Sequence, residues 1–199
     1  YTSMLNDNFK VYYKGQSHTL LNNVKGLRYR AGKDIVAYVN PIDNSFNVFY
    51  KGEVHQLEVF APKNYQTGDG FVAYVDNSGM FKVFYKGGVT ELSSFTPDGY
   101  VAEDNILLFT EDRFLKIFTH GQIYDVEGYV PKNFKIDWNS VIYPDNTNRL
   151  WLFKDGDKKM LGNEFVETYD IYRDLVIIGA KFNRTLIYYN TSFYTGVSY

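Results

Sequence analysis

The sequence contains no cysteine and few of the residues that usually mark a chemical site. Without cysteine, disulfides, thiolate catalysis and cysteine-based zinc sites are excluded. The three histidines, His18, His55 and His120, stand outside any metal-ligand spacing. Neither a Gly-x-Ser-x-Gly elbow nor a phosphate-binding glycine-rich loop occurs in the chain. We therefore expect no metal, no cofactor and no nucleophilic active site.

Blocks of one charge and long apolar runs are also missing. The chain has 21 basic and 23 acidic residues, interspersed, for a net charge of −2. No basic block can neutralise a phosphate backbone, so nucleic acid is not an expected partner. The longest uncharged apolar run, residues 175–180, is too short to cross a bilayer. The chain opens at Tyr1 rather than at Met, and we expect a processed or excised piece of a longer protein.

What the chain does have is a seven-residue stretch that returns at a nearly fixed interval. It reads FKVFYKG at residues 81–87, with close copies at 9–15 and 46–52 and looser ones at 115–121, 150–156 and 186–192. The glycines that close the first five copies follow one another at 34 to 37 residues. Such a period indicates a repeat architecture. The repeats run approximately over residues 1–23, 24–60, 61–95, 96–129, 130–165 and 166–199.

The third repeat shows the internal plan most clearly. Short apolar or alternating segments at 64–67, 71–75, 80–85 and 89–95 are separated by turns rich in Asp, Asn and Gly. Four antiparallel strands per repeat is the plan of a propeller blade. The first repeat has room for a second strand at residues 1–5 but none for a first strand.

The third strands carry large apolar groups on both faces, for example Phe81 and Val83 on one face and Phe84 on the other. A strand that is apolar on both faces must be covered on both faces. Blades packed face to face provide this cover. We therefore predict an all-β fold, a single domain over residues 1–199 that forms a six-bladed β-propeller of four-stranded blades with an incomplete first blade. A flat repeat solenoid is the structural alternative.

The repeats resemble those of the TolB protein and its relatives, and more broadly WD40-like bacterial propellers. A blade of that family starts near a Pro, crosses a Gly or Asp turn and continues with an apolar strand. Here Thr96-Pro97-Asp98-Gly99 and Gly68-Asp69-Gly70-Phe71 carry this pattern, followed by residues 81–87 and a closing Leu92. The resemblance implies blade topology. Propellers usually seal the ring by pairing strands from the two chain ends, so we expect upstream residues or a partner's strand to complete the first blade. The alternative is an exposed edge that encourages association.

Two sets of turn residues are candidates for an interaction rim. The turns between second and third strands present Asp7, Asp43, Asp76, Asp112 and Asp145. These could attract a cation or a basic partner, or simply bond the backbone of their own turns, which we favour. On the opposite rim, Lys14, Lys51, Lys86 and His120 each precede a turn glycine. They could meet an anionic surface or decorate a solvated edge, and we favour the edge.

Paired carboxylates are the one enzymatic option in the sequence. Asp69, Asp104, Asp137 and Asp174 end the first strands, where propeller glycosidases and lyases place their acids. We expect these four acids to occupy equivalent repeat positions, which a shared turn explains better than catalysis.

Exposed aromatic side chains could instead stack on sugars. The candidates are Trp138, Trp151, Tyr65 and Tyr100, with Tyr12, Tyr172, Tyr194 and Tyr199 as further ones. Most tyrosines and phenylalanines are expected to wedge between the sheets.

No repeat looks conspicuously odd or loaded with polar groups. We therefore predict a noncatalytic recognition or assembly module of an exported bacterial protein, with a protein partner or a larger parent chain and a periplasmic, cell-surface or secreted location. A carbohydrate-binding propeller with repeated shallow aromatic sites is the alternative. A polysaccharide hydrolase or lyase is the third hypothesis.

Overall fold

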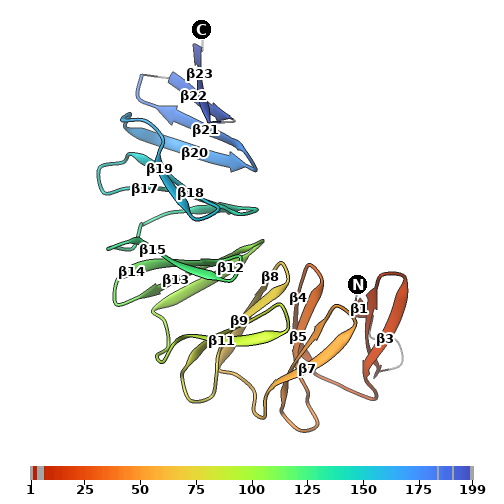
Figure 1. Ribbon diagram of the computed structural model, residues 1–199. Coiled ribbons are helices and arrows are strands. Elements are labelled where there is room, and N and C mark those ends of the chain that lie inside the picture. The colour runs from red at the N-terminus through yellow and green to blue at the C-terminus, as the bar shows by residue number, and fades with distance from the viewer. Residues whose placement is uncertain (1, 4–6, 183, 190, 198–199) are drawn as a thin grey trace. The chain divides into compact units, whose positions relative to one another are not determined.

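The computed structural model describes residues 2–3, 7–182, 184–189 and 191–197, and these residues form antiparallel sheets joined by short turns (Figure 1). The chain divides into two compact units, Tyr1–Pro97 and Asp98–Tyr199. Three sheets lie in each unit. The predicted all-β fold of four-stranded antiparallel sheets is confirmed for five of these sheets, while the described residues of the first sheet supply three strands.

The first unit contains the first, second and third sheets. The first sheet consists of β1 (Thr2–Ser3), β2 (Phe9–Tyr13) and β3 (Gln16–Leu21). The second consists of β4 (Arg28–Gly32), β5 (Ile35–Val39), β6 (Phe46–Tyr50) and β7 (Glu53–Glu58). The third consists of β8 (Asn64–Gly68), β9 (Phe71–Val75), β10 (Phe81–Tyr85) and β11 (Gly88–Ser93). The strand expected at residues 1–5 lies partly outside the described residues, and its described part is β1.

The second unit contains the fourth, fifth and sixth sheets. The fourth consists of β12 (Gly99–Glu103), β13 (Ile106–Glu111), β14 (Phe114–Thr119) and β15 (Gln122–Glu127). The fifth consists of β16 (Lys135–Asp137), β17 (Ser140–Pro144), β18 (Leu150–Lys154) and β19 (Asp157–Met160). The sixth consists of β20 (Val166–Tyr172), β21 (Leu175–Ala180), β22 (Arg184–Tyr189) and β23 (Ser192–Val197).

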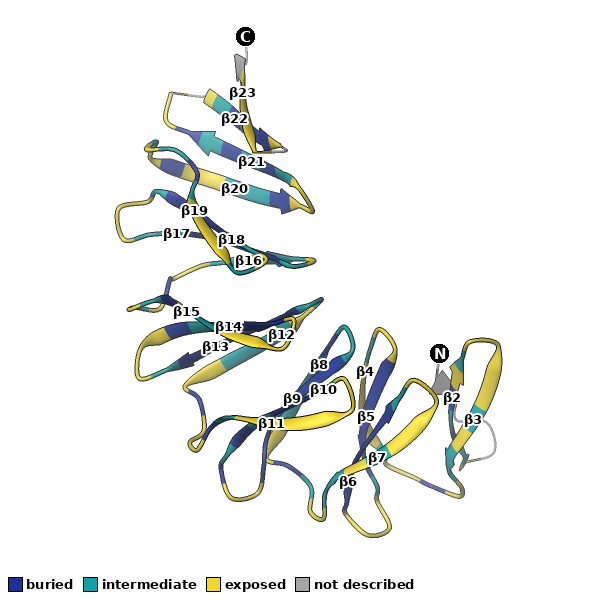
Figure 2. Cartoon of the chain, in the orientation of Figure 1, coloured by how far each residue is buried: buried dark blue, intermediate teal, exposed yellow. Residues whose placement is uncertain are grey.

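The second and third strands are the most buried strands of each complete sheet, and the fourth strands are mostly exposed (Figure 2). Every residue of β5 and of β9 is buried, as expected for strands that are apolar on both faces. Their side chains meet between the second and third sheets, where Val48, Tyr74 and Phe84 belong to one apolar cluster. Burying one such large side chain stabilises the fold by about 1.5–3 kcal/mol.

The first strands of neighbouring sheets lie beside each other within each unit. In the first unit β4 contacts β8, and in the second unit β16 contacts β20. In each unit a backbone hydrogen bond also joins the turns that follow two first strands, β4 and β8 in the first unit and β12 and β16 in the second. Gly70 N donates to Lys33 O at 2.9 Å in the first unit, and Asn105 N donates to Trp138 O at 3.1 Å in the second. The first strands therefore form the surface on which residues from successive repeats come together.

Candidate functional site

A groove in the first unit brings basic and aromatic side chains of two repeats together. It has a volume of about 530 Å³ and lies between the first strand of the second sheet and the first strand of the third. Arg28 and Arg30 alternate along β4 and therefore share one face of that strand. Lys63 lies just before β8, and Tyr29 and Tyr65 also line the groove. We call these five residues the basic groove.

The three cations of the basic groove have no acidic partner. Among the residues that the structure describes, Arg28, Arg30 and Lys63 take part in no ion pair, and all three are exposed. The matching strands of the second unit are neutralised, because Lys135 pairs with Asp170 at 3.0 Å. In the described part of the first unit, these three positive charges on and beside the first strands thus have no ion-pair partner.

Tyr65 holds a fixed place in the basic groove. Its ring lies 4.9 Å from the ring of the fully buried Phe46. Burial raises the pKa of Tyr65, and the charges of Arg28 and Arg30 act in the opposite sense. Arg28 and Arg30 line the same groove as Tyr65, so positive charge lies on the side of the groove that faces this ring.

Tyr29 forms the other aromatic side of the basic groove. It is 42% exposed, and its ring lies 5.4 Å from the buried ring of Phe9 in the first sheet. The groove thus offers two anchored rings beside three unpaired cations. Such a surface suits an extended anionic ligand that carries apolar or aromatic groups.

Of these five residues, only Tyr65 was predicted from the sequence as a candidate site residue. The available signal was the alternation Arg28-Tyr29-Arg30 on a first strand, followed one repeat later by Lys63. That signal becomes visible only once first strands of successive repeats are placed side by side.

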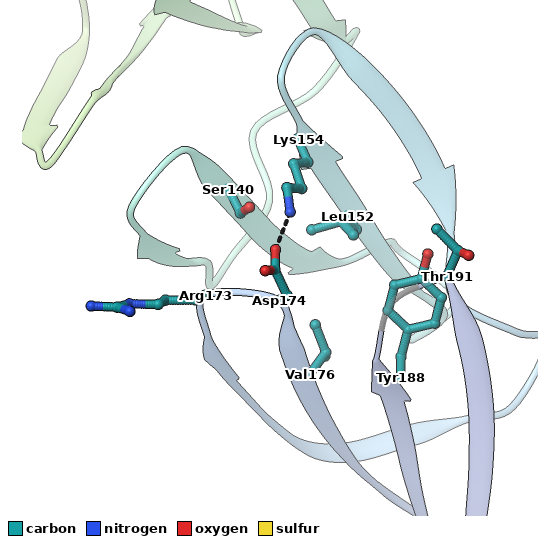
Figure 3. Close-up of a pocket in the computed structure, with 8 residues that line it drawn as sticks. All are labelled: Ser140, Leu152, Lys154, Arg173, Asp174, Val176, Tyr188 and Thr191. Atoms are coloured by element: carbon teal, nitrogen blue, oxygen red, sulfur yellow. Dashed lines mark hydrogen bonds and ion pairs between the residues drawn. The ribbon is translucent and has the colours of Figure 1, made fainter.

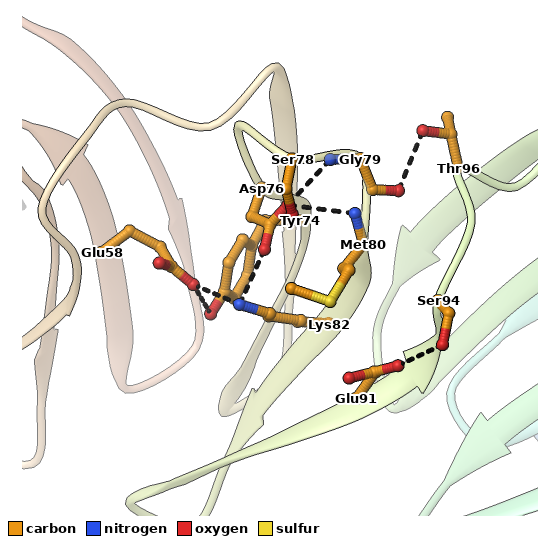
Figure 4. A network of polar contacts seen from close by, with 10 residues as sticks. All are labelled: Glu58, Tyr74, Asp76, Ser78, Gly79, Met80, Lys82, Glu91, Ser94 and Thr96. Atoms are coloured by element: carbon orange, nitrogen blue, oxygen red, sulfur yellow. Dashed lines mark hydrogen bonds and ion pairs between the residues drawn. The ribbon is translucent and has the colours of Figure 1, made fainter.

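The carboxylate of Asp76, one of the predicted acidic-rim residues, accepts hydrogen bonds from residues of its own turn (Figure 4). It accepts hydrogen bonds from Ser78 Oγ at 2.6 Å, Gly79 N at 2.9 Å and Met80 N at 3.0 Å. Lys82 lies 2.7 Å from the same carboxylate. Burial alone would raise the pKa of Asp76, but Lys82 and these hydrogen bonds outweigh it and hold the pKa well below its usual range.

Asp145 repeats this arrangement in the second unit. Its carboxylate accepts from Thr147 N at 2.7 Å, Arg149 Nε at 2.9 Å and Trp151 Nε1 at 3.1 Å. Burial alone would raise the pKa of Asp145. The hydrogen bonds from Thr147, Arg149 and Trp151 outweigh this effect and hold the pKa far below its ordinary value.

The other acidic-rim residues lie in turns or beside them, and each has a defined structural role. Asp43 accepts from Ser45 Oγ at 2.6 Å and from Ser45 N at 2.9 Å, and these bonds lower its pKa. Asp112 adopts a left-handed backbone, with φ of 50°, in the turn between β13 and β14. The backbone carbonyl of Asp7 accepts from Val24 N at 2.7 Å. The turn interpretation therefore accounts for Asp43, Asp76 and Asp145, whose carboxylates bond their own turns.

The lysines of the opposite rim form the turns between third and fourth strands. Lys14, Lys51 and Lys86 have φ of 47°, 50° and 50°, and the glycine after each also has positive φ. Two residues of positive φ suit the right-handed twist of a hairpin. Each ammonium lies over the tyrosine that precedes it, at 5.4, 5.1 and 5.0 Å from the ring centroid. His120 has the same backbone conformation, with φ of 52°.

The expectation that four first-strand acids occupy equivalent positions is wrong. Asp69 and Asp104 take the first place of the two-residue turn, Asp174 takes the second, and Asp137 is the last residue of β16. Asp104 accepts from Trp138 N at 2.6 Å, and Asp137 accepts from Arg173 N at 2.8 Å. These two acids join the turns of neighbouring sheets, a structural role that the repeat alignment did not reveal.

The predicted stacking aromatics lie in different local surroundings. Tyr65 lies in the basic groove, and Tyr100 lies half-buried on β12. Trp138 is 43% exposed, with the Arg173 guanidinium 5.8 Å from its ring. Trp151 is covered by Lys158 at 4.5 Å and lines a separate cavity of about 230 Å³.

Within the described ranges, no three His, Cys, Asp or Glu side chains are grouped in a way that could hold a metal ion. The same residues contain no helix long and apolar enough to cross a membrane.

Comparisons with known proteins agree with the sheet pattern. A family model described as a 10-bladed beta propeller domain matches residues 3–194. No curated protein matches the chain. The prediction of a propeller repeat is thereby confirmed, whereas the relationship to TolB stays a prediction.

Several solved structures are similar to this chain. The computationally designed Ika8 protein is 19% identical, with 100% of this chain and 70% of that chain covered and a TM-score of 0.40. The CRINKLY WD40 ectodomain of the Arabidopsis thaliana receptor kinase ACR4 is 8% identical, with coverage of 89% and 72% and a TM-score of 0.46. A chain from the structure of Kap60 bound to yeast RCC1 (Prp20) is 9% identical, with coverage of 87% and 60% and a TM-score of 0.45. With such low scores these structures carry no argument about function.

Proposed function

The chain belongs to the family of 10-bladed beta propeller domains, and from this premise we propose that it is a noncatalytic recognition module whose basic groove binds an acidic segment of a protein partner. The observation that carries the proposal is the set of three exposed, unpaired cations, Arg28, Arg30 and Lys63, around two anchored tyrosines. Complementary charge speeds encounter with an acidic partner and fixes its register.

An extended acidic peptide fits the basic groove best. Two adjacent first strands offer cations spaced along β4 and at the start of β8, so a peptide laid across them meets charges from both repeats. Arginine binds carboxylates with two parallel hydrogen bonds, which adds geometric specificity to charge. Tyrosines at the sides favour a segment in which acidic and apolar residues mix.

Binding of a dye-labelled peptide of mixed Glu and Phe, followed by fluorescence anisotropy, tests the proposal. Replacing Arg28, Arg30 and Lys63 together with Ala should weaken binding at least about tenfold, and added salt should weaken wild-type binding. The matched control replaces Lys14, Lys51 and Lys86 with Ala, which removes the same charge from another part of the same unit. Equal losses in the two triple variants would mean that net charge, and not the basic groove, governs binding.

A noncatalytic role is part of the proposal. Support comes from Asp104 and Asp137, two of the candidate acids, because one carboxylate oxygen of each accepts a hydrogen bond from a backbone amide of a neighbouring turn. The hydrolase or lyase hypothesis predicts turnover of a polysaccharide panel that is lost in Asp104→Asn and Asp137→Asn. No turnover in the wild type would remove that hypothesis.

The blade count and the location complete the proposal. We take each of the six sheets as one blade, and the family description names ten. Counting blades in electron micrographs of the purified protein distinguishes a six-bladed ring from a larger one. We also propose an exported bacterial protein that resides in the periplasm, on the cell surface or in the medium, which fractionation of the source cells would test.

A further inference from the structure

The junction between the fifth and sixth sheets departs from the pattern of the other repeats. The first residue of the second strand is Ile35, Phe71 and Ile106 in the second, third and fourth sheets, and each is buried. The fifth sheet has Ser140 at this place, only 1% exposed. Its cross-strand neighbour on the third strand is Lys154, where the second and third sheets have a tyrosine. The fifth sheet therefore differs from the second and third sheets at this one pair of positions.

This exchange opens a cavity. A serine fills much less space than isoleucine or phenylalanine, and a cavity of about 290 Å³ lies here between the fifth and sixth sheets (Figure 3). Small-molecule sites usually measure roughly 300 to 1,000 Å³. The cavity is thus at the lower limit of that range, which suits a ligand no larger than a single ring with its substituents.

Ser140 lines this cavity, and its buried hydroxyl has no hydrogen-bond partner in the part of the chain that the structure describes. Among the described residues, Ser140 Oγ is the one buried side-chain polar atom that has no hydrogen bond. Buried hydroxyls in folded proteins nearly always have a partner, and an exception requires an explanation. A ligand group in the cavity that exchanges a hydrogen bond with Ser140 Oγ supplies one.

The charges of the cavity balance each other. Lys154 Nζ is bonded to the carboxylate of Asp174 from the sixth sheet. Arg173 points away from the other lining side chains in Figure 3, and its guanidinium lies near the ring of Trp138. A ligand with a net charge would add an uncompensated charge to this pair, which is costly in a partly enclosed site.

The remaining lining is apolar. Leu152, Val176 and the buried ring of Tyr188 face the same cavity. The Tyr188 hydroxyl accepts a hydrogen bond from Lys159 Nζ at 3.2 Å, and its ring supplies an apolar surface. A suitable ligand has an apolar face together with neighbouring groups that both donate and accept hydrogen bonds.

We infer that this cavity binds one neutral polyhydroxylated ring, such as a single saccharide residue. Its hydroxyls donate to Asp174 and accept from Lys154 and Ser140, while its C–H face packs on Val176 and Tyr188. This site is independent of the basic groove, since all its residues belong to the second unit.

Saturation-transfer NMR with glucose, galactose, mannose and N-acetylglucosamine tests the inference. The wild type should bind at least one of these sugars, with a dissociation constant of about 1 mM or lower. Ser140→Ile, which restores the residue of the second sheet and fills the cavity, should abolish the signal. Ser140→Ala, which keeps the space and removes the hydroxyl, should weaken binding about threefold to tenfold.

The control is Ser17→Ile, at an exposed position of β3, which should leave sugar binding unchanged. Thermal unfolding checks that each variant is folded. Silence on all four sugars, a signal that survives Ser140→Ile, or binding of only glycine or acetate would overturn the inference. Binding of the acidic peptide to the basic groove should be the same in Ser140→Ile and wild type, so the two proposals fail separately.

Discussion

The Tyr143 hydroxyl donates a hydrogen bond of 2.8 Å to the carboxylate of Glu127, 16 residues earlier on the fourth strand of the preceding sheet. Tyr74 makes the same bond to Glu58 at 3.0 Å, with the same separation of 16 residues (Figure 4). A lysine completes each pair, Lys158 at 2.6 Å from Glu127 and Lys82 at 2.8 Å from Glu58. These polar bridges pin the outer edge of one sheet to the buried second strand of the next.

Removing the phenol of such a bridge should destabilise the protein. We expect Tyr143→Phe to lower the free energy of unfolding by about 1–3 kcal/mol, because the bond involves a charged group and Tyr143 is fully buried. Urea denaturation followed by tyrosine and tryptophan fluorescence measures the change. Tyr12→Phe, at a residue that is 54% exposed, serves as the control and should change little. Equal stability of Tyr143→Phe and wild type would show that the bridge is unimportant.

Acid should weaken the fold through Asp145. Its folded pKa is depressed, so its contribution is complete above the unfolded pKa of about 4 and is lost as pH falls toward the folded pKa. At neutral pH, Asp145→Asn should cost about 1–3 kcal/mol of unfolding free energy. The gap between variant and wild type should then narrow from about pH 5 to about pH 2. A gap that stays constant over this interval would contradict the assignment.

Alkali should weaken the fold through Tyr38. Burial, aided by the charge of Asp43, raises the pKa of Tyr38 to about 12. A raised folded pKa gives stability that is complete below the unfolded pKa of about 10 and is lost as pH rises toward the folded value. Denaturation at several pH values should therefore show a smaller alkaline loss for Tyr38→Phe than for wild type. Tyr74 and Tyr143, whose pKa values are also raised by burial, should account for part of the remaining loss.

Two adjacent glycines, Gly87 and Gly88, allow the cost of backbone strain to be measured without a steric clash. Gly87 has φ of 87°, and a Cβ added to it would meet no atom within 4 Å. Gly87→Ala should therefore cost about 1–2 kcal/mol through conformation alone. Gly88 lies outside the left-handed region and its added Cβ would meet only Tyr85 O at 4.0 Å, so Gly88→Ala is the matched control and should be nearly neutral. Thermal unfolding of both variants makes the comparison, and equal losses would refute it.

The sheets were predictable from the sequence because each central strand is apolar on both faces and ends at Asp, Asn or Gly. The third repeat illustrates this, since the segments expected at 71–75 and 80–85 appear as Phe71–Val75 and Phe81–Tyr85. The turn-stabilising role of Asp76 could also be predicted from the sequence, because Asp76 and Ser78 have the spacing at which a side chain bonds its own turn.

The candidate sites were much harder to predict from the sequence. Arg28 and Lys63 come together only because the first strands of two repeats run side by side, which no local pattern reveals. Ser140 is unremarkable as a residue and becomes informative only against the residues that fill the same place in other sheets. The acids of the first turns were expected at equivalent positions, but Asp104 takes the first place of its two-residue turn and Asp174 takes the second place of its own.

Each sheet draws its ladder of hydrogen bonds from one continuous segment of the chain. A gene that gains or loses one copy of the repeat by unequal recombination therefore leaves the pairing within all other copies intact. Once copies exist in series, a substitution such as serine for isoleucine at a single junction creates a new chemical environment there while its sister junctions continue to hold the fold. Repetition in this chain thus protects the scaffold while individual junctions diverge.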